Sequence, residues 1–258
     1  MKLNYELTDK IKTFIKDSEL EEIKIGCSDS QVFRINKENN IYYLKVAKYG
    51  LLTSEYKKLS WLKGKLKVPE IVLYDKTKKV EYLITKALKG EMVCSKKFEE
   101  DPIKGMKIIK EAFDNIYSVD IKKCPFDVSI DYKLNLVKNN VENSIISIDQ
   151  VDKKILEKYK TLENILDYLI KNKFYDELCF SHGDTSLPNI FAKDDQFAGF
   201  IDVGECGIAD KWFDLAICEK SIVRNYGKKY VKDFYDLLGI KRDKKKVEYY
   251  LLMMQLYL

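Results

Sequence analysis

Three polar side chains in the second half of the sequence have the types and spacing to act on a phosphate ester. Asp184 stands five residues before Asn189, and a second acid, Asp202, follows a segment expected to form a β-hairpin. A carboxylate can orient an acceptor hydroxyl and take its proton, while magnesium prefers carboxylate and amide oxygens when it bridges nucleotide phosphates. The spacing therefore predicts phosphoryl transfer from a nucleotide to a hydroxyl group.

The order of these residues matches the kinase catalytic loop. There, an aspartate precedes a metal-binding asparagine by five residues, and a second metal-binding aspartate follows on the next hairpin. Here the matching stretches read HGDTSLPN at 182–189 and IDVG at 201–204. Each part has a structural alternative: Asp184 could cap a turn, and Asn189 could be a turn former. His182, the single histidine, fits a structural role better than that of a base.

A lysine in the first third of the chain supplies an independent test. Lys45 lies at the centre of the apolar segment IYYLKVA (41–47), where an unpaired charge would cost free energy. Glu55, in the first turn of the following helix, can pair with it, as in kinases that hold nucleotide phosphates with such a lysine. Strand alternation puts Tyr43 on the same face as Lys45, where it could lie against an adenine. The alternative is an ordinary edge-strand lysine.

The elements that must position these residues change in kind near residue 88. Before it, apolar alternation predicts strands at 22–25, 31–35, 41–47, 71–74 and 80–87, with helices at 7–17, capped by Thr8, and at 54–66. After it, helical periodicity predicts helices at 103–117, 131–142, 160–172, 211–224, 228–238 and 243–256, with short strands at 177–180, 189–192 and 197–202.

These patterns predict an α+β protein with a small antiparallel sheet in the N-terminal lobe and a mostly helical C-terminal lobe. We expect residues 1–87 to bind the nucleotide and residues 88–258 to carry the catalytic and substrate-binding groups. A ligand cleft between two lobes is the default expectation for such a chain.

Composition excludes several other classes of protein. The 46 basic and 41 acidic residues are interspersed, without the one-sided stripe typical of nucleic-acid binding. No apolar run approaches the roughly 18 residues of a membrane span, and charges interrupt the N-terminal segment, unlike a secretory signal. Six cysteines lack metal-ligand spacing. We expect a cytoplasmic monomer or weak dimer with free thiols and a small-molecule substrate.

Longer stretches of the sequence resemble the aminoglycoside phosphotransferases, most closely their 3′-phosphotransferase branch. The matching segments span nearly the whole chain: YLKV (43–46), WLKGKLKVPEIV (61–72), FSHGDTSLPNIF (180–191), FIDVGECGIADKWFDLA (200–216) and YDLLGIK (235–241). The resemblance implies a protein-kinase-like bilobal fold. It also implies an ATP- and Mg²⁺-dependent kinase of aminoglycoside hydroxyls, expected at the 3′ position, that confers antibiotic resistance.

The resemblance also implies roles for individual residues. Asp184 would be the catalytic base, and Asn189 and Asp202 the magnesium ligands. The nucleotide would be held by residues of the first lobe: Lys45 on the phosphates, Glu55 as its ion-pair partner, Ser28 over the β-phosphate, and backbone groups of Thr85 and Ala87 at the adenine.

The acceptor region departs from the family pattern. Relatives bind polycationic aminoglycosides through acidic residues, whereas segment 143–155 here is more apolar and basic, and Arg224 and Gln255 stand where acids are expected. The remaining candidate cation partners are Glu205, Asp210, Asp214, Glu219 and the terminal carboxylate of Leu258. Asp210 and Asp214 could equally be structural. The alternatives are therefore a kinase of another small hydroxylated metabolite, or a non-catalytic nucleotide-binding module.

Overall fold

The computed structural model describes residues 6–23 and 30–257 and divides into two compact units. The first unit runs to Glu91 and includes Phe191–Gly204, while the second comprises Met92–Ile190 and the chain from Glu205 onward. The sequence predicts a first lobe of residues 1–87 without the later segment. The difference arises because the backbone N–H of Phe200 donates to the Lys67 carbonyl at 2.9 Å, and Lys67 Nζ donates to the Phe197 carbonyl at 3.0 Å.

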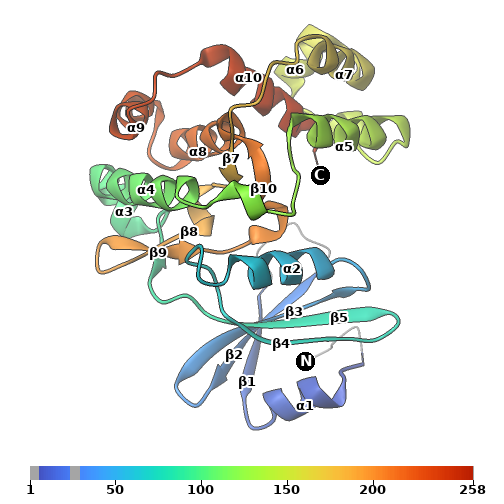
Figure 1. Ribbon diagram of the computed structural model, residues 1–258, viewed down its shortest axis with the longest axis vertical. Helices are drawn as coiled ribbons and strands as arrows, with labels where there is room; N and C mark the ends of the chain where they lie inside the picture. Colours follow the sequence, from blue (N-terminus) through green and yellow to red (C-terminus); the bar gives the residue numbers. More distant parts are fainter. Residues whose placement is uncertain (1–5, 24–29, 258) are drawn as a thin grey trace. The chain divides into compact units, whose positions relative to one another are not determined.

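The first unit is built on a five-stranded sheet with the order β1-β2-β3-β5-β4, in which all neighbours are antiparallel (Figure 1). A two-residue turn joins β2 to β3: Glu38 and Asn39 have φ values of +49° and +61°, the left-handed conformation that this turn requires. The elements of this unit are α1 (Asp9–Ile15), β1 (Glu19–Ile23), β2 (Gln31–Lys37), β3 (Asn40–Lys48), α2 (Thr53–Leu62), β4 (Ile71–Lys76) and β5 (Val80–Lys86).

The two faces of this sheet carry different residues because side chains alternate along each strand. Leu44 and Val46 of β3 lie opposite Ile84 and Tyr82 of β5, and all four pack with Ile11 of α1 in one buried cluster. Lys45 lies opposite Leu83 and points to the other face, where it contacts Glu55 of α2. Helices α1 and α2 therefore cover opposite faces, and the lysine faces α2.

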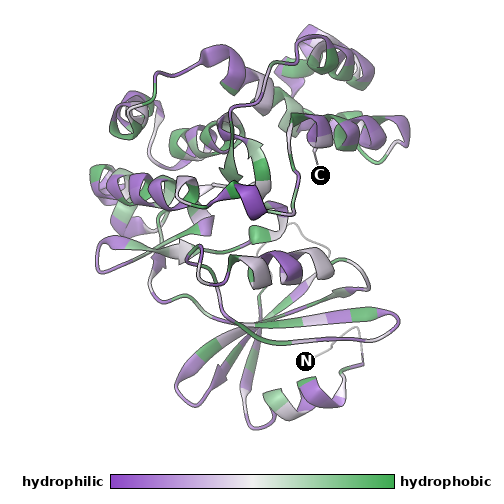
Figure 2. Cartoon of the chain, viewed as in Figure 1, coloured by the Kyte–Doolittle hydropathy of each residue, from purple (hydrophilic) through white to green (hydrophobic). Residues whose placement is uncertain are grey.

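The second unit is mostly helical, as the sequence predicts. Helix α4 illustrates why: Asp101 caps it by accepting from the Lys104 N–H at 3.2 Å, and Pro102 occupies its first turn. Hydrophobic and hydrophilic residues are interleaved along this helix (Figure 2). The helices are α3 (Lys96–Glu100), α4 (Pro102–Tyr117), α5 (Ile130–Glu142), α6 (Lys153–Tyr159), α7 (Leu162–Lys171), α8 (Lys211–Asn225), α9 (Val231–Leu238) and α10 (Lys244–Met253).

Short strands flank the motif-bearing segments. Strands β7 (Leu178–Ser181) and β10 (Gly207–Asp210) form an antiparallel pair, and β6 (Glu91–Met92), β8 (Ile190–Lys193) and β9 (Gln196–Phe200) form a three-stranded sheet. The β8–β9 turn contains Asp194 and Asp195 in left-handed conformation, at the turn that the sequence predicts. Six single-turn 3₁₀ helices complete the described chain: Ile121–Lys123, Ile148–Gln150, Leu187–Asn189, Val203–Glu205, Lys228–Tyr230 and Met254–Leu256.

Four short elements are absent from the sequence prediction: β6, α3, α6 and β10. Helix α6 falls partly in the segment 143–155 and ends at Lys160 with φ +70°; Thr161 then caps a separate helix, α7. Strand β10 has only four residues and depends on pairing with β7. Such short elements depend on contacts distant in the sequence, so local periodicity does not reveal them.

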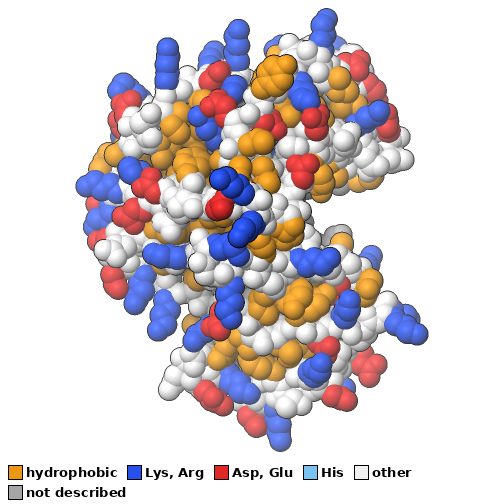
Figure 3. All heavy atoms as spheres, in the orientation of Figure 1, with side chains coloured by type: hydrophobic (Ala, Val, Ile, Leu, Met, Phe, Trp, Pro, Cys, Tyr) orange, Lys and Arg blue, Asp and Glu red, His pale blue; other side chains and the backbone are white. Residues whose placement is uncertain are grey.

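The distribution of charged side chains and the state of the cysteines match what the composition predicts. On the face in Figure 3, basic and acidic side chains are interspersed over most of the surface. Across residues 6–23 and 30–257, no helix combines the length and hydrophobicity of a membrane span. The cysteines at positions 94, 124, 179, 206 and 218 are free, as predicted.

Candidate active site

Three of the predicted residues meet in the first unit. Lys45 Nζ lies 2.8 Å from Glu55 Oε1 and 2.6 Å from Asp202 Oδ1. The predicted ion pair between Lys45 and Glu55 is therefore present, and Asp202 joins it from the segment after β9. The Glu55 side chain is 13% exposed and that of Asp202 is 54% exposed, so the ion-pair cluster has one partly buried and one accessible carboxylate.

The charge of Lys45 is maintained by its neighbours. Burial acts to lower the pKa of the lysine, but the carboxylates of Glu55 and Asp202 outweigh it and raise the pKa above its usual value. The ammonium group is therefore charged at neutral pH and positioned at the accessible carboxylate. An anionic ligand arriving there would find a fixed positive charge.

A buried glutamate positions the helix that supplies Glu55. Glu81 of β5 is fully buried and accepts hydrogen bonds from the backbone N–H groups of Leu52 and Thr53, at 2.7 and 2.9 Å, where α2 begins. Tyr74 Oη also donates to it at 2.9 Å. Burial alone would raise the pKa of Glu81, but these donors lower it, so the carboxylate is ionised at the helix N-terminus.

The catalytic-loop residues meet in the second unit. Asn189 Nδ2 donates to Asp184 Oδ2 at 2.8 Å and to the Asp184 carbonyl at 3.0 Å. The backbone N–H of Ser186 donates to Asp184 Oδ1 at 3.2 Å. These contacts fix the carboxylate of Asp184 while leaving it partly exposed, and they direct the amide oxygen of Asn189 away from Asp184.

The loop that carries Asp184 is stabilised by Asp214, a buried acid on α8. Asp214 is fully buried and accepts from the backbone N–H groups of His182 at 2.7 Å and Gly183 at 3.0 Å, and its carbonyl accepts from Thr185 Oγ1 at 2.7 Å. Burial raises the pKa of Asp214. Gly183 has φ +87°, and a Cβ there would lie 2.4 Å from the Glu205 carbonyl oxygen, so only glycine fits before Asp184.

His182 has the structural role that the sequence favours. It is fully buried, and its Nδ1 accepts the backbone N–H of Asp184 at 3.2 Å. A further contact was missed from the sequence: Ser221 Oγ accepts the backbone N–H of Leu187 at 2.9 Å. Ser221 lies seven residues after Asp214, so one face of α8 supports the loop at two points.

Each unit contributes a side chain with oxygen atoms of the kind that magnesium prefers. Asp202 of the first unit offers carboxylate oxygens, and Asn189 of the second unit offers an amide oxygen. In the part of the chain that the structure describes, no cluster of three or more His, Cys, Asp or Glu side chains could hold a metal by itself. Kinase sites are of this type, because phosphate and water oxygens complete the coordination.

The residues expected around the adenine lie on the sheet of the first unit. Tyr43 and Thr85 are opposite each other in the β3–β5 ladder, on the Lys45 face, and both are half-buried. The N–H of Ala87 already donates to the Ile41 carbonyl at 2.9 Å, so a base would have to displace that hydrogen bond to use this amide. Ser28 lies outside the described residues.

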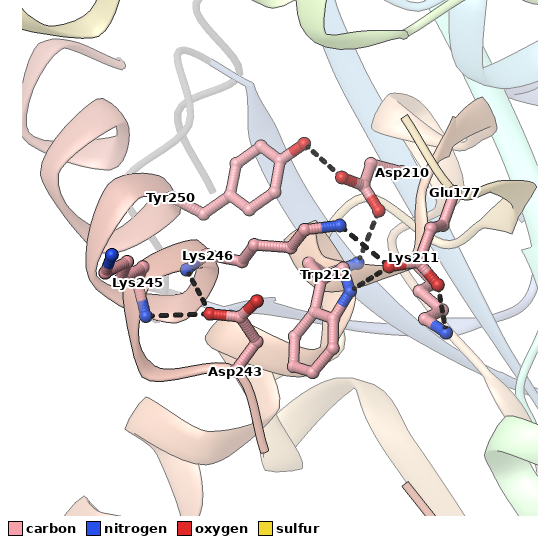
Figure 4. Close-up of polar contacts among 8 residues, drawn as sticks. All are labelled: Glu177, Asp210, Lys211, Trp212, Asp243, Lys245, Lys246 and Tyr250. Atoms are coloured by element: carbon pink, nitrogen blue, oxygen red, sulfur yellow. Dashed lines mark hydrogen bonds and ion pairs between the residues drawn. The ribbon is translucent and has the colours of Figure 1, made fainter. Parts of the chain in front are cut away.

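Asp210, a candidate substrate-binding acid that could equally be structural, is buried and hydrogen-bonded within the protein. It is 1% exposed, accepts from the backbone N–H of Trp212 at 3.1 Å as the cap of α8, and accepts from Tyr250 Oη at 3.0 Å (Figure 4). Burial raises its pKa to about 6. The neighbouring Glu177 contacts Lys211, Lys246 and the Trp212 indole, and these donors lower its pKa to about 2 (Figure 4).

Glu219 is also engaged within the protein. It is 7% exposed, its oxygens accept from Arg242 at 2.7 and 2.8 Å, and Tyr235 Oη donates to it at 2.9 Å. The sequence does not reveal that Arg242 and Tyr235 contact this acid on α8. Glu205 is exposed, and Leu258 lies outside the described residues.

Comparison with known proteins agrees with this geometry. A sequence model of the phosphotransferase enzyme family matches residues 19–250, which include the ion-pair cluster and the loop. The chain belongs to the phosphotransferase enzyme family. Two relatives have similar lengths: an aminoglycoside 3′-phosphotransferase of Enterococcus faecalis is 33% identical, covering 100% of this chain and 99% of its own, and one of Staphylococcus aureus is 32% identical over the same shares.

Solved structures confirm the predicted protein-kinase-like fold of this phosphotransferase. An aminoglycoside 3′-phosphotransferase of type VIII superposes with a TM-score of 0.82 at 21% identity, covering 96% of this chain and 97% of the other. An aminoglycoside phosphotransferase of Streptomyces rimosus, solved with ADP and streptomycin, superposes with a TM-score of 0.76 at 20% identity, covering 96% of each chain.

Proposed function

We propose that this phosphotransferase transfers the γ-phosphoryl group of ATP to the 3′-hydroxyl of an aminoglycoside. The observation that carries the proposal is the pair of assembled groups: Lys45 with Glu55 and Asp202 in the first unit, and Asp184 with Asn189 in the second. Curated relatives at 32–33% identity, named aminoglycoside 3′-phosphotransferases, support the substrate class and the position of transfer.

In this proposal the two groups act on one nucleotide. Lys45 binds the α- and β-phosphates, with Glu55 holding its ammonium in place. Tyr43 and the strand end at Thr85 and Ala87 accommodate the adenine. Asp202 and Asn189 would hold Mg²⁺, which neutralises phosphate charge when bound. Ser28 is proposed to cover the β-phosphate.

Asp184 orients the acceptor hydroxyl and takes its proton. The hydroxyl oxygen forms a bond to the γ-phosphorus, the bond from that phosphorus to the β–γ bridging oxygen breaks, and ADP leaves. Because the transition state of such transfers is usually loose, positioning by Asp184 matters more than its basicity. The contacts of Asp184 with Asn189 and Ser186 provide that positioning.

An ADP-release assay with kanamycin- and neomycin-like aminoglycosides tests this function. We expect drug-stimulated turnover in the wild type and a loss of orders of magnitude in Asp184→Asn, with nucleotide binding retained. Phosphorus NMR of the product would identify the modified hydroxyl. Absence of turnover with every aminoglycoside would refute the substrate assignment, and equal behaviour of wild type and variant would favour a non-catalytic module.

A second candidate is a kinase of the same fold that acts on a less cationic hydroxylated metabolite. It is favoured by the internal engagement of Asp210 and Glu219, which removes two acids from the candidate cation partners. Gln255, which stands where an acid is expected, accepts the backbone N–H of Asp152 at 3.0 Å. Turnover with a fraction of a metabolite extract, but with no aminoglycoside, would establish this second function.

A further inference from the structure

A buried lysine on α2 contacts the segment that carries the proposed metal ligand Asp202. Lys58 is 6% exposed, and its Nζ donates to the Gly204 carbonyl at 2.5 Å, across 146 positions of sequence. Burial of an ammonium group is costly unless it is hydrogen-bonded or paired. A buried lysine therefore needs a compensating contact at this position, and the Gly204 carbonyl provides one.

Lys58 and Glu55 lie three residues apart on α2 and are neighbours on its surface. Glu55 holds Lys45, and Lys45 holds the carboxylate of Asp202. Lys58 holds the carbonyl two residues further on. One face of α2 thus contacts both ends of the segment 202–204. It reaches Asp202 through Lys45, and it contacts Gly204 directly through Lys58.

The segment 202–204 needs such support because the backbone of Asp202, the proposed metal ligand, is in the left-handed conformation. Asp202 has φ +56°, a left-handed conformation that costs a non-glycine residue free energy unless the surroundings impose it. The 3₁₀ turn Val203–Glu205 follows immediately, and Val203 is fully buried. A charged donor on the Gly204 carbonyl, together with this burial, fixes the direction in which the Asp202 carboxylate leaves the chain.

We propose that Lys58 is a positioning residue that keeps Asp202 oriented for a nucleotide-bound divalent cation. The proposal rests on the metal role of Asp202 in the proposed function. If Lys58 is removed, the segment populates other conformations, and the apparent affinity for the metal–nucleotide complex is multiplied by the fraction of molecules that remain oriented. Binding of nucleotide without metal depends on Lys45 instead and is spared.

The test compares Lys58→Met with Lys57→Met, which removes the exposed neighbouring lysine of the same helix. Calorimetry measures binding of a non-hydrolysable ATP analogue with Mg²⁺ and with EDTA. We expect Lys58→Met to weaken binding about ten- to hundredfold with Mg²⁺, as for loss of a hydrogen bond to a charged group, and less than about threefold with EDTA. Lys57→Met should match the wild type in both, and Lys58→Arg should restore most of the affinity.

Hydrogen exchange gives a readout that needs neither metal nor acceptor. Amides of residues 200–206 should exchange faster in Lys58→Met than in Lys57→Met, while those of β7 stay unchanged. Equal exchange in the two variants, or equal loss of nucleotide affinity with and without Mg²⁺, would overturn the proposal. Neither measurement uses an aminoglycoside, so a failure of the substrate assignment leaves this test interpretable.

Discussion

Replacement of Asp214 by asparagine should both destabilise the protein and slow phosphoryl transfer. The carboxylate accepts two backbone N–H groups, at 2.7 and 3.0 Å, from the residues immediately before Asp184. Asparagine retains one acceptor oxygen but turns an NH₂ group toward the other donor. The hydrogen bond from that donor is lost and its buried N–H is left without an acceptor, which costs about 1–3 kcal/mol, and the remaining hydrogen bond no longer has a charged acceptor.

The size of the effect follows from these terms and one that opposes them. Burial raises the pKa of Asp214, so removal of its charge recovers part of the cost of desolvation. We expect a net loss of about 2 kcal/mol in the free energy of unfolding, or about 4–8 °C in Tm for a chain of this size. Displacement of Asp184 by a fraction of an ångström should lower kcat by about ten- to hundredfold, with little change in the KM for ATP.

Denaturant unfolding and steady-state kinetics would measure both effects. Asp236→Asn is a matched control, because Asp236 is an exposed acid that pairs with Lys232 one turn earlier at a solvent-accessible site, where an ion pair contributes little to stability. The reasoning would be refuted if Asp214→Asn unfolded within about 1 kcal/mol of the wild type and kept its kcat within twofold.

Three further changes probe the ion-pair cluster and the two perturbed acids of Figure 4. Lys45→Met should raise the KM for ATP and lower kcat, each by at least about tenfold; unchanged kinetics would contradict its phosphate-binding role. The pKa of Asp210 is raised to about 6, so the folded protein binds the proton of this carboxyl group more tightly than the unfolded chain does. Protonated Asp210 therefore adds to the free energy of unfolding at low pH, and that contribution is lost as the pH rises from about 4 through 6. Asp210→Asn should therefore gain about 3 kcal/mol relative to wild type between pH 4 and 7, and a pH-independent difference in unfolding free energy would exclude this cause. The pKa of Glu177 is lowered to about 2, so its contribution is present above about pH 4.5 and lost as pH falls. The Glu177 side chain is 47% exposed, so Glu177→Gln should lower the free energy of unfolding by only about 1 kcal/mol at pH 7 and leave it unchanged near pH 2. Chemical unfolding at several pH values would measure this difference. A decrease that is the same at every pH would contradict the ion-pair origin.

Much of the site was predictable because its residues follow one another closely in the chain. The spacing of Asp184 and Asn189 is local, and a five-residue separation within a tight loop leaves the side chains few alternatives to contact. The pairing of Lys45 with Glu55 was also predictable, since a charge at the centre of an apolar strand requires a partner and the next helix offers a carboxylate in its first turn.

The acids of α8 were harder to assign because all have the same local signature. Asp210, Asp214 and Glu219 each lie in an amphipathic helix or at its cap, where an exposed and a buried carboxylate look alike in the sequence. Asp210 caps the helix and meets Tyr250, Asp214 holds the catalytic loop, and Glu219 meets Arg242. The partners stand 23 to 40 residues away, so packing decides the role of each acid.

By itself, the sequence determined the order of the longer strands and helices, the position of the loop around Asp184 and the family to which the chain belongs. These depend on periodicity and short spacing, which are properties of neighbouring residues. Only the tertiary structure decided that Phe191–Gly204 joins the first unit, that Lys58 contacts Gly204, and that two candidate substrate acids are internal. The physical reason is that a buried charge takes whichever partner the packed chain brings within hydrogen-bonding distance, and that partner has no fixed separation in sequence.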